Sequence, residues 1–344
     1  MNTQTKVKAK FFSETLGLSP LKTRIKQSKL IFTGKKHVPS SSFDLSSIGH
    51  LKPSVSIPLW LGKYKIKNKV IISNLYNHTP TPIEDGWSVK KTQTKDFRHR
   101  KLTYDSHNAT DFAIPINSTL LAAAPGKVVL IKSEFNRGGL KIVIDHGKGL
   151  LSCSVHLARA LVKVGQEVKR GEPIAITGYS GFDGFITCPF GIPHVHFNTW
   201  HNSIPVDPFA NGEEEESIWV GENNLPEPIE KIKNEVFNVS PVNPANLEKV
   251  ISTCLDKELA EQLNNIESTH LRACHVVFEM AYYPTLFPQK LNVWKQDFSR
   301  EKRLKLIRVK IKVRFFMDNT IEHRKPFANS KNNLLRYRRI AKHI

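Results

Sequence analysis

The chain has 344 residues, of which 40% are hydrophobic, and its formal net charge is +20 at pH 7. The apolar content includes 19 Phe and 5 Trp, which is enough for a packed core and excludes a globally disordered chain. No stretch approaches the ~18 consecutive apolar residues of a membrane span, so we expect no transmembrane segment. Four cysteines without close spacing are too few for a disulfide framework.

The positive charge lies at the two ends of the chain. Residues 1–40 carry nine Lys or Arg and one Glu, and residues 301–344 carry fourteen Lys or Arg and three acidic residues. The residues between them are close to neutral. Such ends predict an anionic partner, for example a wall polymer or an anionic membrane, although basic tails can also serve only to solvate the chain. The neutral middle and the lack of a basic–aromatic RNA motif argue against nucleic acid.

The first part of the chain is predicted to be a leader followed by a flank. Residues 1–50 are basic, and we expect them to be mostly irregular. They contain no apolar run of secretory-signal length, so no signal peptide is predicted. Residues 51–94 are expected to form a β-rich flank, because IPLWLGKYKI (57–66) and NKVIISNLYN (68–77) are rich in β-branched and aromatic residues.

Between residues 103 and 208, short apolar runs alternate with glycine turns. Strands this short at such close spacing favour antiparallel β-structure over βαβ units, and no helix is expected there. The side chains expected to form the core are Phe112, Val128, Ile142, Ile144, Val168, Ile174, Ile176, Val195 and Phe197. Trp87 and Trp200 are assigned packing roles, with a place in a substrate groove as the alternative.

The C-terminal part, residues 213–344, is predicted to be an α-rich, basic extension. Residues 243–266 have apolar side chains at helical spacing, with Asn243 as the cap and Pro244 in the first turn. Residues 270–283 predict a second helix that ends at Pro284. Residues 302–316 alternate basic and apolar side chains, which predicts a strand with one wet face.

A set of histidines in the β-rich segment carries the candidate chemistry. His107 and Asp111 are four residues apart and can converge on one cation, while His194 and His196, at i and i+2 of a strand, share one face. Two His and one Asp supply three protein ligands and leave the fourth position of a zinc ion for water, as in catalytic sites. His156 stands alone, and a lone histidine is more often a packing or surface residue.

The surrounding sequence resembles the lysostaphin/LytM-type zinc metallopeptidases, which cut bacterial peptidoglycan. HNATDFAIPINSTLLAAAPGKVVLI is similar to their first metal motif, and GGLKIVIDHGKGLLSCSVHLARALVKVGQEVKRGEPIAITGYSG is similar to their central segment. PHVHFNTW is similar to their closing HxH strand. The similarity covers residues 87–210, and PVDPFA with SIWVGENNLPEP resembles a bacterial subgroup with long flanking regions.

The resemblance implies a fold, a metal and an activity. The fold would be mainly β, an antiparallel β-sandwich of the duplicated hybrid motif type at residues 95–212, with the zinc in an open groove. His107, Asp111 and His196 would bind one Zn²⁺, and His156 and His194 would be catalytic without binding it. A zinc-bound water would attack the scissile amide of a peptidoglycan cross-link. We assign His194 as the base and His156 as the oxyanion stabiliser, although the sequence does not order the two roles.

Three features of the sequence lie beside the expected ligands and catalytic residues: Ala109, the loop before the HxH strand, and His146. The family usually has Gly where Ala109 stands, and Ala would cost about 1 kcal/mol if this position requires a positive φ. The loop before the HxH strand is longer than the compact version, so it either shapes the cleft or is a tolerated surface loop. His146 matches a structural position and is expected to pack at a turn or strand end.

Two alternatives remain beside an active peptidase. A non-catalytic regulator of wall hydrolases could share the fold, but such relatives usually lack metal ligands, and this chain keeps the full set. A biotinyl or lipoyl carrier needs an exposed lysine in a hairpin such as MKM or DKA, which is absent. The localisation is left open, since the expected substrate lies in the cell envelope or periplasm while no signal peptide is predicted.

Overall fold

The computed structural model describes residues 8–63, 70–77, 87–88, 104–207, 236–298 and 315–317. Most of the strand predicted over residues 302–316 lies outside these residues. The boundaries predicted between leader, flank, core and extension stay predictions. Within the described part, no helix combines the length and the hydrophobicity that a membrane crossing requires.

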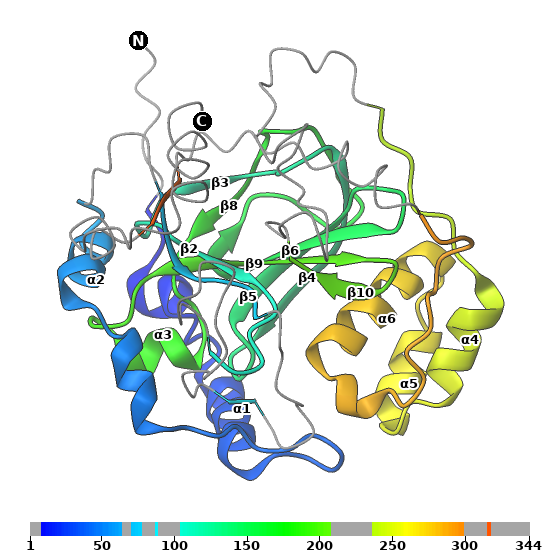
Figure 1. Cartoon of the computed structure of the whole chain (residues 1–344), viewed down its shortest axis with the longest axis horizontal. Coiled ribbons are helices and arrows are strands. Elements are labelled where there is room, and N and C mark those ends of the chain that lie inside the picture. Colours follow the sequence, from blue (N-terminus) through cyan, green and yellow to red (C-terminus); the bar gives the residue numbers. More distant parts are fainter. Residues whose placement is uncertain are drawn as a thin grey trace, which may run out of the picture.

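One large sheet forms the centre of the molecule (Figure 1). Its strands are β1 (Val70–Asn74), β2 (Thr110–Ala113), β3 (Thr119–Leu121), β4 (Gly126–Glu134), β5 (Gly139–Asp145), β6 (Leu150–Ala160), β7 (Glu167–Val168), β8 (Pro173–Thr177), β9 (His194–His201), β10 (Ile204–Val206) and β11 (Phe315–Met317). The main path runs β11-β1-β2-β9-β6-β5-β4-β7, while β8 pairs with β6 and β3, and β10 pairs with β9. Every pairing between these strands except that of β1 with β11 is antiparallel, so the antiparallel β core is confirmed, as an open sheet.

The sheet buries apolar side chains on both faces, as the period of two along a strand requires. On β5, Ile142 and Ile144 join one cluster, while Val143 between them joins the other. All nine predicted core side chains are 8% exposed or less. Trp200 is fully buried in the second cluster, which confirms its packing role.

Three helices cover one face of the sheet: α4 (Pro244–Ser252), α5 (Lys257–Asn264) and α6 (Thr269–Tyr282) (Figure 1). Asn243 caps α4 as predicted, because its side-chain oxygen accepts the N–H of Asn246 at 3.2 Å. The single helical pattern predicted over 243–266 is split, since Asp256 caps a new helix. The helix α6 ends before Pro284, as predicted, and a short 3₁₀ helix, η5 (Pro284–Leu286), follows it.

The N-terminal part is more helical than predicted. The expected irregular leader contains η1 (Phe11–Thr15), α1 (Leu21–Thr33) and the 3₁₀ helix η2 (Leu45–His50). The helix α1 is held by tertiary contacts: Arg24 is 7% exposed and donates to the backbone and side-chain oxygens of Ser133 at 3.1 and 2.8 Å. Such contacts between residues 109 positions apart leave no periodic signal in the local sequence.

Two further elements correct the sequence analysis. The first half of the strand predicted over residues 57–66 is helical, in α2 (Pro53–Trp60), because Pro53 starts a helix favourably at its first position. A short helix, α3 (Phe182–Thr187), lies in the segment for which no helix was expected. Six residues are too few for a helical period to be recognised. The predicted flank strand is confirmed by β1.

Candidate metal and catalytic site

Neighbouring strands bring the five predicted site residues together. The pairing of β2 with β9 places Asp111 directly opposite His196. His194 lies two residues earlier on the same face of β9, and His107 lies in the loop that enters β2. On the other side of β9 runs β6, which carries His156.

Three donor atoms converge at the position predicted for the metal. His107 Nε2 lies 3.3 Å from His196 Nδ1 and 3.2 Å from Asp111 Oδ1, and His196 Nδ1 lies 2.8 Å from the same oxygen. Ligand atoms bound tetrahedrally to one zinc at ~2.0–2.1 Å are ~3.3 Å apart. Two separations match this value, and the third is that of a direct hydrogen bond between His196 and Asp111. The donor set therefore fits one Zn²⁺ ion.

The flank strand β1 orients two of these donors. His107 donates its Nδ1–H to the carbonyl oxygen of Leu75 at 2.7 Å, which leaves the Nε2 lone pair facing the site. Asn74 donates its side-chain N–H to Asp111 Oδ2 at 2.8 Å. Partners of this kind fix the tautomer of a ligating imidazole and the rotamer of a carboxylate. Asn74 and Leu75 were not predicted as site residues, because no motif links them to the histidines.

The electrostatics keep the donors in forms that bind a metal. Asp111 is fully buried, which by itself would raise its pKa, but the nearby imidazoles of His107, His194 and His196 hold that pKa well below its usual range. Burial lowers the pKa of His196, which the Asp111 carboxylate offsets only in part. An ionised carboxylate and a neutral imidazole are the forms that bind zinc.

His156 and His194 share one hydrogen-bonding arrangement. His194 donates its Nδ1–H to the carbonyl oxygen of Ile192 at 2.7 Å, and His156 donates its Nδ1–H to that of Ser180 at 2.9 Å. The two ring centres are 4.7 Å apart. Burial, and then the neighbouring His194 and His196, hold the pKa of His156 well below its usual value, so its ring is neutral near pH 7. Each Nε2 can then accept a proton or, once protonated, donate one.

His156 has an unusual backbone conformation for a residue on a strand. Its φ is +63°, and the pairing between β5 and β6 shifts in register around it, which marks a β-bulge. Its N–H donates to the carbonyl oxygen of Gly138 in the β4–β5 turn at 3.0 Å. Bulges re-aim side chains next to active sites, and a positive φ outside glycine costs about 1–3 kcal/mol. The fold therefore stabilises a costly conformation at the predicted catalytic histidine.

Three other singled-out positions lie outside the donor set. Ala109 is fully buried and does not have a positive φ, so the cost considered for this substitution does not arise. His146 donates its Nδ1–H to the carbonyl oxygen of Pro125 at 2.9 Å, and its Nε2 lies 2.7 Å from the Ser152 hydroxyl, in agreement with a packing role. The guanidinium of Arg137 lies over the ring of Trp87, with Cζ 4.4 Å from the centre of that ring.

A second group of ligand-type side chains joins the core to the C-terminal helices. Asp145, His270 and Cys274 lie close enough to hold a metal. However, the Asp145 carboxylate already accepts hydrogen bonds from His270 Nε2 and from the Ser240 N–H and hydroxyl, at 2.8–2.9 Å. It also accepts the N–H of Gly147 at 2.9 Å. With its oxygens satisfied in this way, Asp145 acts as a structural connection.

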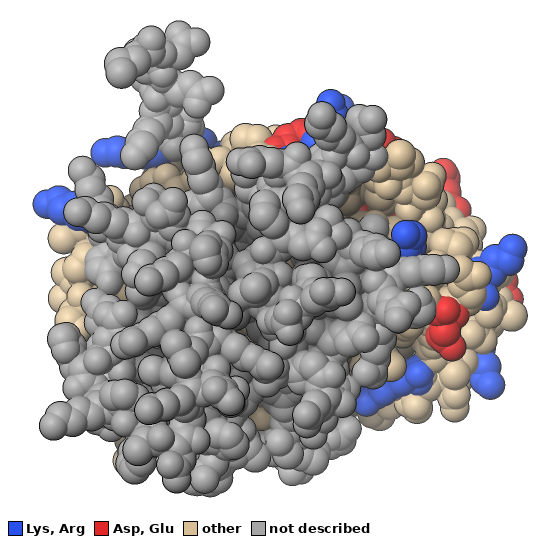
Figure 2. Space-filling view, turned by 45° about the horizontal axis from the view of Figure 1, so that its top comes forward, with Lys and Arg blue, Asp and Glu red and all other residues tan. Residues whose placement is uncertain are grey.

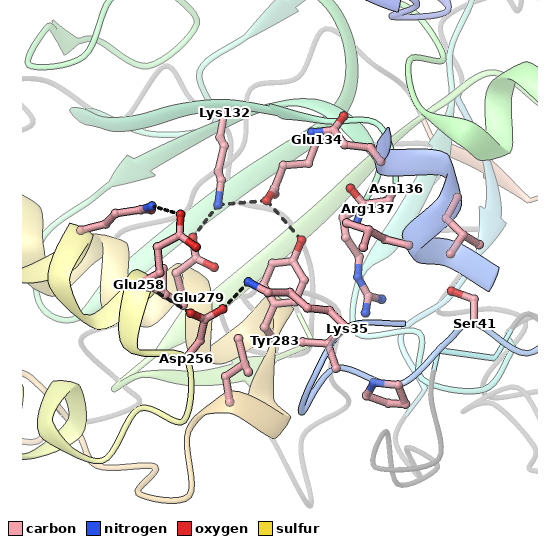
Figure 3. A pocket seen from close by; sticks show the side chains of 18 residues that line it. Lys35, Ser41, Lys132, Glu134, Asn136, Arg137, Asp256, Glu258, Glu279 and Tyr283 are labelled. Atoms are coloured by element: carbon pink, nitrogen blue, oxygen red, sulfur yellow. Dashed lines mark hydrogen bonds and ion pairs between the residues drawn. The ribbon is translucent and has the colours of Figure 1, made fainter. Parts of the chain in front are cut away.

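A cavity of about 240 Å³ lies apart from the histidines, between α1, β4, α5 and α6 (Figure 3). Its charged side chains face one another in pairs: Lys35 is 2.5 Å from Asp256, and Lys132 is 2.6 Å from Glu279. None of the five predicted site residues lines it. The chemistry of the described residues is therefore assigned to the histidine cluster.

Comparison with known proteins agrees with this assignment. Residues 105–208 match the model of peptidase family M23. The chain is 37% identical over 102 residues to peptidoglycan DD-endopeptidase ShyB and 30% identical over 151 residues to peptidoglycan DD-endopeptidase ShyA, both from Vibrio cholerae. These alignments cover 29% and 42% of this chain and 22% and 32% of the relatives.

A third relative is named for a different role. The chain is 44% identical over 64 residues to the murein hydrolase activator EnvC of Escherichia coli, covering 18% of this chain and 15% of that protein. The chain thus spans less than a third of the length of each of these three relatives. The part of the chain that matches peptidase family M23, residues 105–208, contains all five predicted site residues.

Proposed function

We propose that this protein is a zinc-dependent metalloendopeptidase that hydrolyses the peptide cross-links of bacterial peptidoglycan. The observation that carries the proposal is the convergence of His107 Nε2, Asp111 Oδ1 and His196 Nδ1 within 3.3 Å of one another. The family match supports a peptidase, and the relatives named peptidoglycan DD-endopeptidases support the substrate class.

The side chains divide into metal ligands and proton-transfer groups. Held by His107, Asp111 and His196, Zn²⁺ supplies Lewis acidity, which polarises a carbonyl and lowers the pKa of water. His194 accepts a proton from the attacking water through Nε2, because its Nδ1–H is held by a backbone carbonyl. His156 is positioned in the same way beside His194. It would donate to the developing oxyanion or to the leaving amine once its Nε2 has taken up the proton that the attacking water releases.

A non-catalytic activator of other wall hydrolases is the second candidate, and the similarity to EnvC favours it. The complete donor set and the two flanking imidazoles argue for the peptidase, since an activator has no need of either. The two functions differ in whether the purified protein cleaves peptidoglycan cross-links by itself.

The test uses the full chain and a purified cross-linked muropeptide dimer. We expect the zinc-loaded protein to convert the dimer to monomers, a chelator to abolish the conversion, and added Zn²⁺ to restore it. Cleavage that survives exhaustive chelation contradicts the metallopeptidase. If the protein cleaves nothing by itself but accelerates cleavage by an added wall hydrolase, the activator function is assigned instead.

A further inference from the structure

The N-terminal helix α1 presents large apolar side chains to solvent. Leu21, Ile25 and Phe32 are each 62% exposed. At 3.6 residues per turn, these three positions fall within about 40° of one another around the helix, so they form one stripe. The face that holds Arg24 and Ile31 is buried against the body of the protein.

Lysines flank this stripe on the side away from the protein body. Lys22, Lys26 and Lys29 are exposed. Their positions follow the stripe around the helix, beginning about 40° from it. Residues 15–43 contain no Asp or Glu. The accessible side of α1 is therefore apolar along one edge and uniformly basic along the next.

Aromatic contacts extend the stripe toward α3, in the loop before β9. The ring of Phe32 lies 6.1 Å from that of Phe43 and 5.6 Å from that of Phe182 in α3. Phe185 and Ile186, also in α3, are 46% and 49% exposed. The helix α3 belongs to the long loop that leads into β9 and the HxH pair. We name the surface formed by Leu21, Ile25, Phe32 and Phe43 with Lys22, Lys26 and Lys29 the α1 patch.

Part of the surface drawn in Figure 2 has a different character. On its right-hand side, Lys and Arg side chains lie beside Asp and Glu side chains. Interspersed charges of both signs produce little net attraction for an anionic surface. The α1 patch combines exposed apolar area with charge of one sign.

We propose that the α1 patch docks the protein on the surface of an anionic phospholipid bilayer. Basic side chains beside exposed aromatic and aliphatic ones match the boundary between anionic headgroups and acyl chains. The attachment of α1 along one side favours a flat partner. Arg24 bonds to Ser133 on β4, and Gln27 accepts the N–H of Phe135 in the turn that follows. A helix held along one side can rest on a plane without leaving the protein.

The proposal has a geometric consequence and does not depend on the peptidase activity. Because α1 contacts α3 through Phe32 and Phe182, docking places the loop before His194 close to the bilayer. Loss of membrane binding and loss of cleavage are separate measurements, so one can fail without the other.

The test is sedimentation of the full chain with vesicles of phosphatidylglycerol and phosphatidylcholine, against vesicles of phosphatidylcholine alone. We expect binding only to the anionic vesicles, and we expect I25S/F32S and K22E/K26E each to reduce it by about tenfold or more. The matched controls lie on the two loops that flank β7. Leu161 and Val164, before β7, are each 45% exposed, and Lys163, before β7, and Lys169, after it, are exposed. L161S/V164S and K163E/K169E should bind like the parent protein.

Three outcomes would overturn the proposal. Full binding by I25S/F32S shows that the apolar stripe does not enter the bilayer. Equal losses in the control variants show that total charge or hydrophobicity is responsible. Tight binding to soluble polyphosphate that depends on Lys22 and Lys26 but not on Ile25 and Phe32 assigns the patch to an anionic polymer. Circular dichroism of each variant establishes that it is folded.

Discussion

The site histidines differ in which ring nitrogen each one presents. His107, His156 and His194 each donate Nδ1–H to a backbone carbonyl and present Nε2, whereas His196 presents Nδ1 to Asp111. A sequence specifies the residue type but not this choice, which follows from carbonyl groups supplied by other segments. Those carbonyls fix the orientation of each ring. The donors at the metal position differ from the two rings beside it because His107 Nε2 and His196 Nδ1 lie 3.2 and 2.8 Å from Asp111 Oδ1.

Replacing His156 or His194 tests that separation. We expect His156→Ala and His194→Ala to retain zinc and a folded core, because neither ring belongs to the converging donor set. Turnover should fall by roughly 100-fold or more, as expected when a general base or an oxyanion donor is removed. Metal content and kcat are measured on the same preparations. A fully active His156→Ala protein would rule out the oxyanion role.

At the scale of elements, the bulge in β6 depends on the turn between β4 and β5. The carbonyl of Gly138 accepts the N–H of His156, and the turn is held in its own place by α1. Gln27 of α1 accepts the N–H of Phe135 at 2.9 Å, and Arg24 bonds to Ser133 at the end of β4. The N-terminal helix thus supports the turn that supports the catalytic histidine, through contacts over more than 100 residues of sequence.

Gly138→Ala tests this support. Gly138 has a φ of +73°, and an added Cβ would lie 2.5 Å from Cγ1 of Val155, the residue before His156. We expect a loss of about 1–3 kcal/mol in the free energy of unfolding and a lower kcat, because the turn must move away from β6.

The matched control is Gly165→Ala. Gly165 also has a positive φ, +88°, but an added Cβ there would meet nothing within 4 Å. It should lose about 1 kcal/mol of stability and keep its kcat. Equal kcat values in the two variants, measured with urea unfolding on the same samples, would show that the turn does not position His156.

At the scale of the whole molecule, the sequence predicted local features better than long-range ones. Period-two runs around Ile142 and Val195 and the helix cap at Asn243 are local signals, and all three predictions are confirmed. The helix α1 was not predicted, because its stability comes from contacts with β4. The HxH spacing indicated a shared face, but the support from Asn74 required the pairing of β1 with β2, which no motif encodes.

A buried ionic network joins the sheet to the C-terminal helices across the cavity of Figure 3. Glu134 on β4 contacts Lys132 at 3.0 Å, the fully buried Lys141 at 3.1 Å, and the hydroxyl of Tyr283 at 3.1 Å. Burial alone would raise the pKa of Glu134, but Lys141 and Lys132 lower it to about 2. Because this value is below that of an unfolded chain, Glu134 adds stability above about pH 4.5, and that stability is lost as the pH falls toward 2.

Glu134→Gln should therefore have a pH-dependent effect on stability. At pH 7 we expect a loss of ~3 kcal/mol in the free energy of unfolding, because Lys141 is left buried without its anionic partner. The difference from the parent protein should shrink between pH 4.5 and pH 2, measured by urea unfolding. Glu167→Gln, on an exposed residue, is the control and should change stability by less than about 0.5 kcal/mol at any pH. A constant difference across the pH range contradicts the ionised state of Glu134.

Zinc content per chain, measured on purified variants by elemental analysis, tests the central claim most directly. The parent protein should hold about one zinc ion, and His107→Ala, Asp111→Ala and His196→Ala should each hold none and cleave nothing. His146→Ala, which removes a buried imidazole that is not a donor, should keep its zinc and its activity. If His194→Ala loses zinc while His196→Ala retains it, or if any of the three donor variants keeps a full zinc ion, the proposed metal site is wrong.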